Sequence, residues 1–301
     1  MARTARALIT GIEGFTGRYL ADELRLNGYD VFGLTGAESG TLAKDMFSVD
    51  LNDLRGIEAV VNNVQPEVIV HLAAIAFVAP GDVEAIYRTN VVGTRNLLEA
   101  ASKLPATPRA ILLASSANIY GNADVDIIDE SVSAAPANDY AVSKLAMEYM
   151  ARLWADKLPI TLVRPFNYTG VGQSINFLLP KIVDHFKRRA PVLELGNIDV
   201  VRDFSDVRTV VRCYRHLIDR RDKIVSGEVF NICSGQGHSL LEAIELMRNI
   251  SGHPPEIRAN PAFVRANEVK KLVGSRAKLE RAIGVVSSIP LQETLRWMYE
   301  T

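Results

Sequence analysis

Short apolar runs alternate with longer amphipathic stretches over the first half of the chain. The short runs are apolar at nearly every position, as expected of strands covered by helices on both faces. They predict strands at Ala7–Thr10, Asp30–Gly33, Asp45–Val49, Val68–His71, Ala110–Ala114 and Ile160–Arg164. The stretches between them predict helices at Phe15–Asn27, Leu54–Asn63, Asp82–Leu104 and Asn138–Lys157. This alternation is typical of an α/β fold with a doubly wound parallel sheet.

The pattern changes after residue 165, where short mixed elements are separated by Pro, Asn and Gly. We expect residues 1–165 to form the sheet domain and residues 166–301 to form mainly a smaller C-terminal domain that binds substrate. A helix predicted at Asp206–Arg220 and a strand predicted at Glu228–Cys233 are expected to return to the first domain. The return segments therefore cover about residues 203–233.

Composition narrows the classes of function. The 301 residues are 48% hydrophobic and 23% charged, with a net charge of −1, which gives no electrostatic reason to expect nucleic acid or an anionic membrane as partner. No apolar stretch reaches the roughly 20 residues that span a bilayer. The two cysteines show no paired spacing, which favours a reducing cytoplasm. The five histidines are scattered singly, so we expect no metal site.

A glycine-rich turn joins the first predicted strand to the first predicted helix. Glycines let such a turn tighten, and the helix N-terminus then offers N–H groups and partial positive charge to a pyrophosphate. The position predicts a Rossmann-like dinucleotide site, although an ordinary glycine-rich turn is the alternative. Asp50 and Leu51 are expected at the adenine edge, while small side chains after the fourth strand let the cofactor lie against the backbone. The expected cofactor residues here are Gly11, Gly14, Phe15, Thr16, Gly17, Leu72, Ala73 and Ala74.

The end of the second predicted strand bears on whether the site binds NADH or NADPH. NAD sites place an acidic residue there to accept from the ribose hydroxyls, and Phe32–Gly36 contains none. Arg18 directly follows the third glycine and can pair with a 2′-phosphate, although it can equally be a solvated arginine. The sequence therefore favours NADPH, with NADH possible.

A tyrosine and a lysine lie one helical turn apart at the start of a predicted helix. The i, i+4 spacing puts Tyr140 and Lys144 on one face, where an ammonium and the cofactor ring are expected to lower the tyrosine pKa from its usual value of about 10. Such a pair also occurs by chance. Ser116 follows the fifth predicted strand, so its hydroxyl can donate to a substrate oxygen, or simply cap the strand end. Together these residues indicate proton transfer during redox chemistry.

In their order along nearly the whole chain, these motifs resemble those of the extended short-chain dehydrogenase/reductase family. The resemblance implies that Ser116, Tyr140 and Lys144 are the catalytic triad. It also implies that Tyr140, Lys144 and Asn90 lie at the cofactor, with Asn90 in a structural and proton-relay network. The matching segments are residues 10–17, 50–51, 71–74, 90–94, 115–121, 140–144 and 164–167.

The second half is similar to the branch of that family that acts on GDP-mannose derivatives. The matching segments are residues 164–173, 195–207, 265–269 and 272–275. The similarity implies that Asn167, Arg202 and Arg265 meet a diphosphate, that Glu268 accepts from a ribose hydroxyl and that Lys181 lies near the base. These residues also have alternatives without a role in binding. Arg202 can form a local ion pair with Asp203, and Arg265 and Glu268 can be an exposed pair on a helix.

The serine motif bears on the reaction. In the 4,6-dehydratases of this branch a glutamate stands two residues before the Tyr-Gly, and here Asn118 takes that position beside the substrate. An amide cannot shuttle the proton of an elimination. The resemblance therefore implies NAD(P)H-dependent reduction of the C4 keto group of GDP-4-keto-6-deoxy-D-mannose to GDP-D-rhamnose (GDP-6-deoxy-D-mannose). Alternatives are reduction to GDP-6-deoxy-D-talose, a GDP-mannose 4,6-dehydratase or nucleotide-sugar epimerase, and a non-catalytic dinucleotide sensor.

Relatives of this kind commonly dimerise through two helices per subunit that form a four-helix bundle. The corresponding predicted helices are Asp82–Leu104 and Asn138–Lys157, which carry more apolar residues than one buried face needs. We expect a homodimer on this basis, although the same residues can pack on the sheet.

Overall fold

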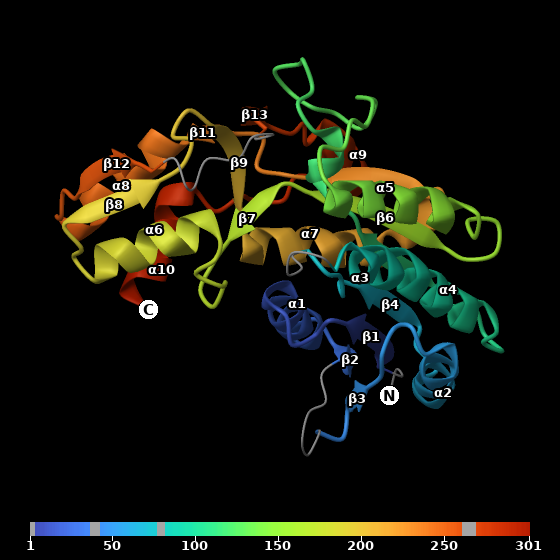
Figure 1. Ribbon diagram of the computed structural model, residues 1–301. Coiled ribbons are helices and arrows are strands. Elements are labelled where there is room, and N and C mark those ends of the chain that lie inside the picture. Colours follow the sequence, from blue (N-terminus) through green and yellow to red (C-terminus); the bar gives the residue numbers. More distant parts are fainter. Residues whose placement is uncertain (1–3, 37–42, 77–81, 261–268) are drawn as a thin grey trace.

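The computed structural model describes residues 4–36, 43–76, 82–260 and 269–301. A sheet of seven parallel strands lies at the centre of the larger of two lobes (Figure 1). The strands are β1 Ala5–Thr10, β2 Tyr29–Thr35, β3 Met46–Ser48, β4 Val68–His71, β5 Ala110–Ala114, β6 Ile160–Pro165 and β10 Glu228–Ile232. Their order across the sheet is β10-β6-β5-β4-β1-β2-β3, and every neighbouring pair is parallel. The predicted Rossmann-like, doubly wound fold is confirmed.

Helices cover both faces of this sheet. One face carries α1 Phe15–Leu26, α7 Val207–Asp219 and α9 Ala277–Ile283, and the other carries α2 Leu54–Val64, α4 Thr94–Ser102 and α5 Asp139–Arg152. Strand side chains alternate between the two cores: in β4, Val68 and Val70 face the first and Ile69 the second. Burial on both faces explains why the strands are apolar at nearly every position.

The helix predicted at Asp82–Leu104 is divided into three pieces. They are α3 Val83–Tyr87, a π-helical turn η1 Arg88–Gly93, and α4. Gly93 leaves no room for a side chain, because a Cβ there would lie 2.8 Å from the Cβ of Leu51. The π turn also buries Asn90. Hydrophobic spacing cannot reveal such a turn, because one extra residue shifts the apolar face only locally.

The second half builds a smaller lobe, on the left of Figure 1. Its core lies among α6 Leu178–Lys187, α8 Leu240–Ser251 and α10 Leu291–Glu300. Three elements return to the large sheet: α7 packs beside α1, β10 pairs with β6, and α9 packs on the same face as α7. The first two lie within the predicted return segment of about residues 203–233, and α9 lies beyond it. The boundary at residue 165 stays a prediction. The short strands beyond it are β7 Asn167–Thr169, β8 Val192–Leu195, β9 Val201–Asp206, β11 Gly237–Ser239, β12 Glu256–Ala259 and β13 Lys271–Leu272.

A buried ion pair fastens α5 to the sheet. Arg164 in β6 donates two hydrogen bonds to the carboxylate of Glu148 in α5, at 2.9 and 2.6 Å. A third guanidinium nitrogen donates to the Tyr120 hydroxyl at 2.8 Å, and Tyr120 donates in turn to Asn231 in β10. Because these polar groups satisfy one another, they can stay buried between helix and sheet. Across the described ranges, no helix combines the length and apolar character needed to cross a membrane.

Candidate active site

A cavity lies at the ends of β1 and β4, where the chain turns from one strand to one face of the sheet and from the other strand to the opposite face. α1, which follows β1, packs on one face of the sheet, and α4, which follows β4, packs on the other. In doubly wound sheets ligands bind at the carboxyl ends of the strands on either side of such a switch point. The cavity has a volume of about 400 Å³, and its walls come from the turn after β1, the ends of β4 and β5, the start of α5 and the segment after β6.

The glycine turn is packed tightly against the neighbouring strand end. Gly11 has a φ of +71°, and a Cβ there would lie 2.9 Å from the Cα of Ala73. A Cβ on Gly17 would lie 2.3 Å from the carbonyl oxygen of Gly11. Gly14 begins α1 without a side-chain cap, and the first turn has no acidic residue, so its N–H groups are available to an anion. This backbone cradle fits a pyrophosphate.

A buried histidine supports the same wall from behind. His71 at the end of β4 is hydrogen-bonded through Nδ1 to Thr10 at 2.7 Å and through Nε2 to Thr94 at 2.8 Å. Burial lowers the pKa of His71 to about 3, so the ring stays neutral. His71 therefore ties β1, β4 and α4 together and is not an acid or base of the site.

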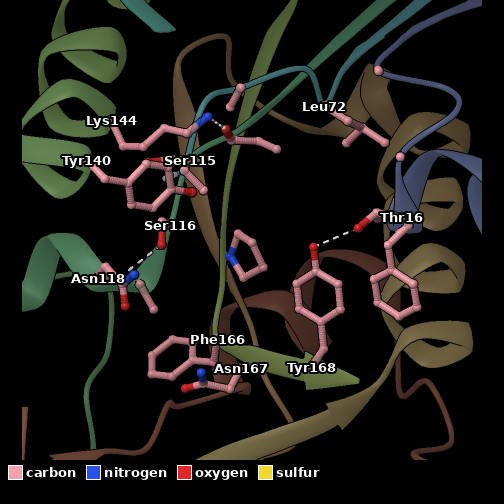
Figure 2. A pocket seen from close by; sticks show the side chains of 18 of the residues that line it. Thr16, Leu72, Ser115, Ser116, Asn118, Tyr140, Lys144, Phe166, Asn167 and Tyr168 are labelled. Atoms are coloured by element: carbon pink, nitrogen blue, oxygen red, sulfur yellow. Dashed lines mark hydrogen bonds between the residues drawn. The ribbon is translucent and has the colours of Figure 1, made fainter. Parts of the chain in front are cut away.

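Ser116 and Tyr140 lie on the same side of the cavity (Figure 2). Tyr140 lies in the first turn of α5, which begins where the Asn138 side chain accepts from the N–H of Ala141 at 2.9 Å. The hydroxyl of Ser116 accepts from the N–H of Asn118 at 3.1 Å, and its proximity partly offsets the rise in the pKa of Tyr140. The capping role of Ser116 is therefore observed, and its donation to a substrate oxygen stays a prediction.

The charges around Tyr140 differ from the sequence-based expectation. Burial, reinforced by the neighbouring Tyr168, raises the pKa of Tyr140 to about 12. Lys144 lies under the same wall, where its Nζ donates to the carbonyl of Ala114 at 2.8 Å and stands 5.9 Å from the Tyr140 ring centre. Burial lowers the pKa of Lys144 to about 8, against the attraction of Glu148. The protein groups alone therefore do not lower the tyrosine pKa, because the phenol is desolvated and the ammonium points to a carbonyl.

Asn90 joins two walls of the cavity without lining it. Its side chain accepts from the N–H of Ile75 at 2.8 Å, and its Nδ2 lies 3.0 Å from both the Ile75 carbonyl and the hydroxyl of Ser143. Ser143 donates in turn to the carbonyl of Tyr140 at 2.7 Å. Asn90 therefore holds the segment after β4 against α5, which is a positioning role.

The predicted cofactor residues fall into two groups. Those that line the cavity are Gly11, Gly14, Phe15, Thr16, Gly17, Leu72, Ala74, Tyr140 and Lys144. Arg18 instead reaches toward the second lobe, with its Nη2 3.4 Å from the carbonyl of Gly172. Asp50 accepts from Asn52 in a local turn, Leu51 is buried, and Ala73 supports Gly11 from behind.

Only part of the predicted substrate set reaches the cavity. Ser116, Asn118 and Asn167 line it, whereas Lys181 on α6 and Arg202 on β9 do not. Arg202 donates to the carbonyls of Val201 and Lys270, and the neighbouring Asp203 accepts from the backbone of Ser234 and Gly235. Arg265 and Glu268 lie outside the described residues.

Several lining residues carried no predicted role. The Tyr168 hydroxyl lies 2.7 Å from the Thr16 hydroxyl, and its ring stacks on Phe15 with centres 6.1 Å apart. The Ser115 hydroxyl is buried in the lining, and no described residue hydrogen-bonds to it. Both residues could have been predicted from the sequence, because they follow β5 and β6 and the ends of such strands face the ligand at the switch point. The others are Ala76, Ala114, Ala117, Asn138, Pro165, Phe166, Gln173, Phe177, Tyr214 and Leu272.

A family model described as the NAD dependent epimerase/dehydratase family matches residues 7–233. This match spans the whole glycine turn, the serine motif and Tyr140. The chain belongs to that family. It is therefore an oxidoreductase that uses a nicotinamide dinucleotide, within the extended short-chain dehydrogenase/reductases, and its relatives act on nucleotide sugars.

Two relatives narrow the family further. The chain is 36% identical to the GDP-6-deoxy-D-talose 4-dehydrogenase of Aggregatibacter actinomycetemcomitans, over 93% of this chain and 91% of the relative. It is 32% identical to the GDP-6-deoxy-D-mannose reductase of Pseudomonas aeruginosa, over 97% and 95%.

Solved structures share the fold, and two of the three were solved with a dinucleotide. A Burkholderia cenocepacia protein, named only provisionally as an epimerase, is 50% identical, with a TM-score of 0.93 over 100% of this chain and 98% of that one. RMD from Pseudomonas aeruginosa, solved with NADPH, is 30% identical, with a TM-score of 0.84 over 99% and 97%. The Thermus thermophilus UDP-glucose 4-epimerase, solved with NAD, is 26% identical, with a TM-score of 0.83 over 98% of each chain. Both forms of the cofactor thus occur in the family.

The cradle makes cofactor binding sensitive to one methyl group. We expect Gly11→Ala to weaken binding of NADH and NADPH by roughly 10-fold or more, because the new Cβ would push against the backbone of Ala73. Fluorescence titration of the reduced nicotinamide measures this. Gly28→Ala is the matched control, because Gly28 also has a positive φ, +81°, with nothing within 4 Å of its Cβ position. Equal binding by both variants would contradict the cradle.

Proposed function

We propose that the chain reduces the C4 keto group of GDP-4-keto-6-deoxy-D-mannose with NADPH or NADH. The names of its two relatives support this, since one is a 4-dehydrogenase of GDP-6-deoxy-D-talose and the other a reductase named for GDP-6-deoxy-D-mannose. These two sugars differ only in configuration at C4, so a single 4-keto sugar is common to both.

The observation that carries the proposal is the chemistry of the cavity wall. Tyr140 and Ser116 supply hydroxyl groups, and the residues that line the described cavity include no Asp or Glu. Elimination of water needs a carboxyl acid/base, and the exposed Asn118 stands at the position where the dehydratases have one. The wall therefore supports a simple reduction over a 4,6-dehydration.

In this reaction the protein supplies the proton for the C4 oxygen and a positive charge near the tyrosine that loses it. The bound reduced nicotinamide supplies the hydride. Tyr140 is neutral near pH 7, because burial raises its pKa to about 12, so its phenol can donate a proton to the C4 oxygen. Ser116 lines the same cavity, and its hydroxyl donates a second hydrogen bond to that oxygen. The phenolate that remains lies near the ammonium of Lys144, 5.9 Å from the ring centre, which would stabilise it once the bound cofactor adds its own positive ring.

The remaining polar residues concern recognition and stereochemistry. Asn167 lines the cavity and is our candidate for the diphosphate. On family similarity alone we propose Arg202 and Arg265 for the same diphosphate, Glu268 for a ribose hydroxyl and Lys181 for the base. GDP-D-rhamnose is the first candidate product. GDP-6-deoxy-D-talose is the second, favoured by the 36% identity to the talose enzyme.

We also propose a homodimer formed through α3, η1 and α5, which pack beside one another. Val142, Tyr149 and Leu153 lie along one side of α5, and Tyr149 and Leu153 are 62% and 82% exposed. Val92 lies in η1, which packs against α5, and is 46% exposed. Burial of these apolar side chains against a second copy would remove them from water. We place the protein in the cytoplasm, a proposal supported by two buried cysteines that are both free.

The product identifies the reaction. Incubation with enzymatically generated GDP-4-keto-6-deoxy-D-mannose and NADPH or NADH is expected to consume the ketone and give one new C4–H signal by NMR. Large couplings of that proton to its neighbours indicate the rhamnose product, and small couplings indicate the talose product. Formation of a 4-keto sugar from GDP-mannose alone would instead mark a dehydratase.

Tyr140→Phe tests the proton donor. We expect turnover to fall by roughly 10²- to 10⁴-fold, while the affinity for the dinucleotide stays near that of the wild type, because only the hydroxyl is removed. Steady-state rates and cofactor titration measure the two effects. Tyr168→Phe is a useful comparison, since its hydroxyl faces Thr16 and not Ser116. Unchanged turnover in Tyr140→Phe would defeat the mechanism.

Leu153→Glu tests the dimer. The charge would have to be buried in the proposed interface, so we expect the variant to sediment as a monomer at micromolar concentration where the wild type is a dimer. Leu26→Glu, at an 84% exposed position at the end of α1, is the control and should stay dimeric. A wild-type chain that is monomeric under these conditions would rule out the homodimer.

A further inference from the structure

The carboxyl end of β2 is the place where dinucleotide folds bind the adenosine ribose. An Asp or Glu about 20 residues beyond the glycine turn accepts from the ribose hydroxyls in NAD sites. Thr35 occupies that place here, so the strand itself brings no carboxylate. The structure nevertheless puts one there, because the hydroxyl of Thr35 donates to the Oε2 of Glu13 at 2.6 Å.

Three successive contacts hold the glycine turn against β2. The N–H of Gly11 donates to the carbonyl of Leu34 at 2.9 Å. The side chain of Ile12 fills the space above Gly33, where a Cβ would lie 2.5 Å from its Cγ2. Glu13 then meets Thr35. The position of its carboxylate therefore follows from backbone packing on both sides, rather than from a single surface contact.

Glu13 is exposed while Thr35 is 6% exposed, so the carboxylate stands at the rim with its anchor beneath it. One oxygen is held by Thr35. A carboxylate has lone pairs for further donors, and the adjacent hydroxyls of an unmodified ribose are such donors. A 2′-phosphate at the same place would bring negative charge against negative charge.

We propose that Glu13 is the residue that makes this site select NAD(H) over NADP(H). The carboxylate comes from inside the glycine turn and replaces the missing acid of β2. The inference deepens the proposed function, since it rests on the dinucleotide site of that reductase, and it holds whichever sugar is reduced.

Arg18 does not supply the opposite charge at this place. Its guanidinium reaches the carbonyl of Gly172, in the segment after β7 in the smaller lobe. β7 and β2 lie on different sides of α1 (Figure 1). The sequence indicated NADPH from two features, a second strand without an acid and an arginine after the third glycine. In the tertiary structure the carboxylate of Glu13 lies at the end of the second strand, and the arginine contacts the smaller lobe instead of this place.

Cofactor affinity measured without any sugar tests the inference. Calorimetric or fluorescence titration of the full chain is expected to give a dissociation constant for NADH at least about 10-fold lower than for NADPH. In Glu13→Gln the affinity for NADPH should rise and that for NADH should fall, which narrows the ratio to within roughly threefold. The amide keeps the size of the side chain but loses its charge.

Two further variants separate charge from structure. Thr35→Val removes the hydroxyl that anchors the carboxylate. It should lower the preference for NADH over NADPH, but less than Glu13→Gln does. Glu245→Gln makes the same chemical change at a 60% exposed carboxylate on α8, outside the site, and should leave the ratio unchanged. Added salt should also narrow the wild-type ratio, because it screens the repulsion, and should affect Glu13→Gln less.

The outcomes are distinct. Equal affinities in the wild type, or an unchanged ratio in Glu13→Gln, would overturn the role of Glu13 and leave the proposed reduction intact. Failure of the wild type to bind either dinucleotide would remove both proposals.

Discussion

The contact between the backbone of Gly11 and that of Ala73 is the constraint on which the site depends. β1 and β4 are neighbours in the sheet, and the chain leaves them toward opposite faces. Only a residue without a side chain fits between the two strand ends, where a Cβ would lie 2.9 Å from the Cα of Ala73. This close packing aims the uncapped start of α1 into the crevice and sets Thr16 opposite Tyr168.

The opposite wall is built on a helix whose position depends on the sheet. α5 carries Tyr140 and Lys144, and Glu148, one turn further on, is held by the guanidinium of Arg164 in β6. The same carboxylate attracts the Lys144 ammonium, whose pKa burial lowers to about 8. A buried ion pair thus fixes the helix and also limits the loss of charge at the lysine beside the cavity.

The glycine turn performs more than one task because it is packed on both sides. Its backbone forms the anion cradle, and its one acidic side chain lies against the end of β2 through Thr35. Binding of the pyrophosphate and discrimination at the ribose would then depend on adjacent residues of one short segment.

The sequence by itself determined the parallel sheet, the succession of its strands and helices along the chain, and the serine, tyrosine and lysine that line the cavity. Burial on both faces makes the strands apolar throughout, and the serine and tyrosine motifs directly follow their strand or begin their helix. The π turn at Asn90, the short strands of the second lobe, the raised pKa of Tyr140 and the partners of Arg18 and Glu13 came only from the tertiary structure. Local periodicity reports which side of an element is buried, whereas these features depend on contacts between segments far apart in the chain or on departures from regular helix geometry.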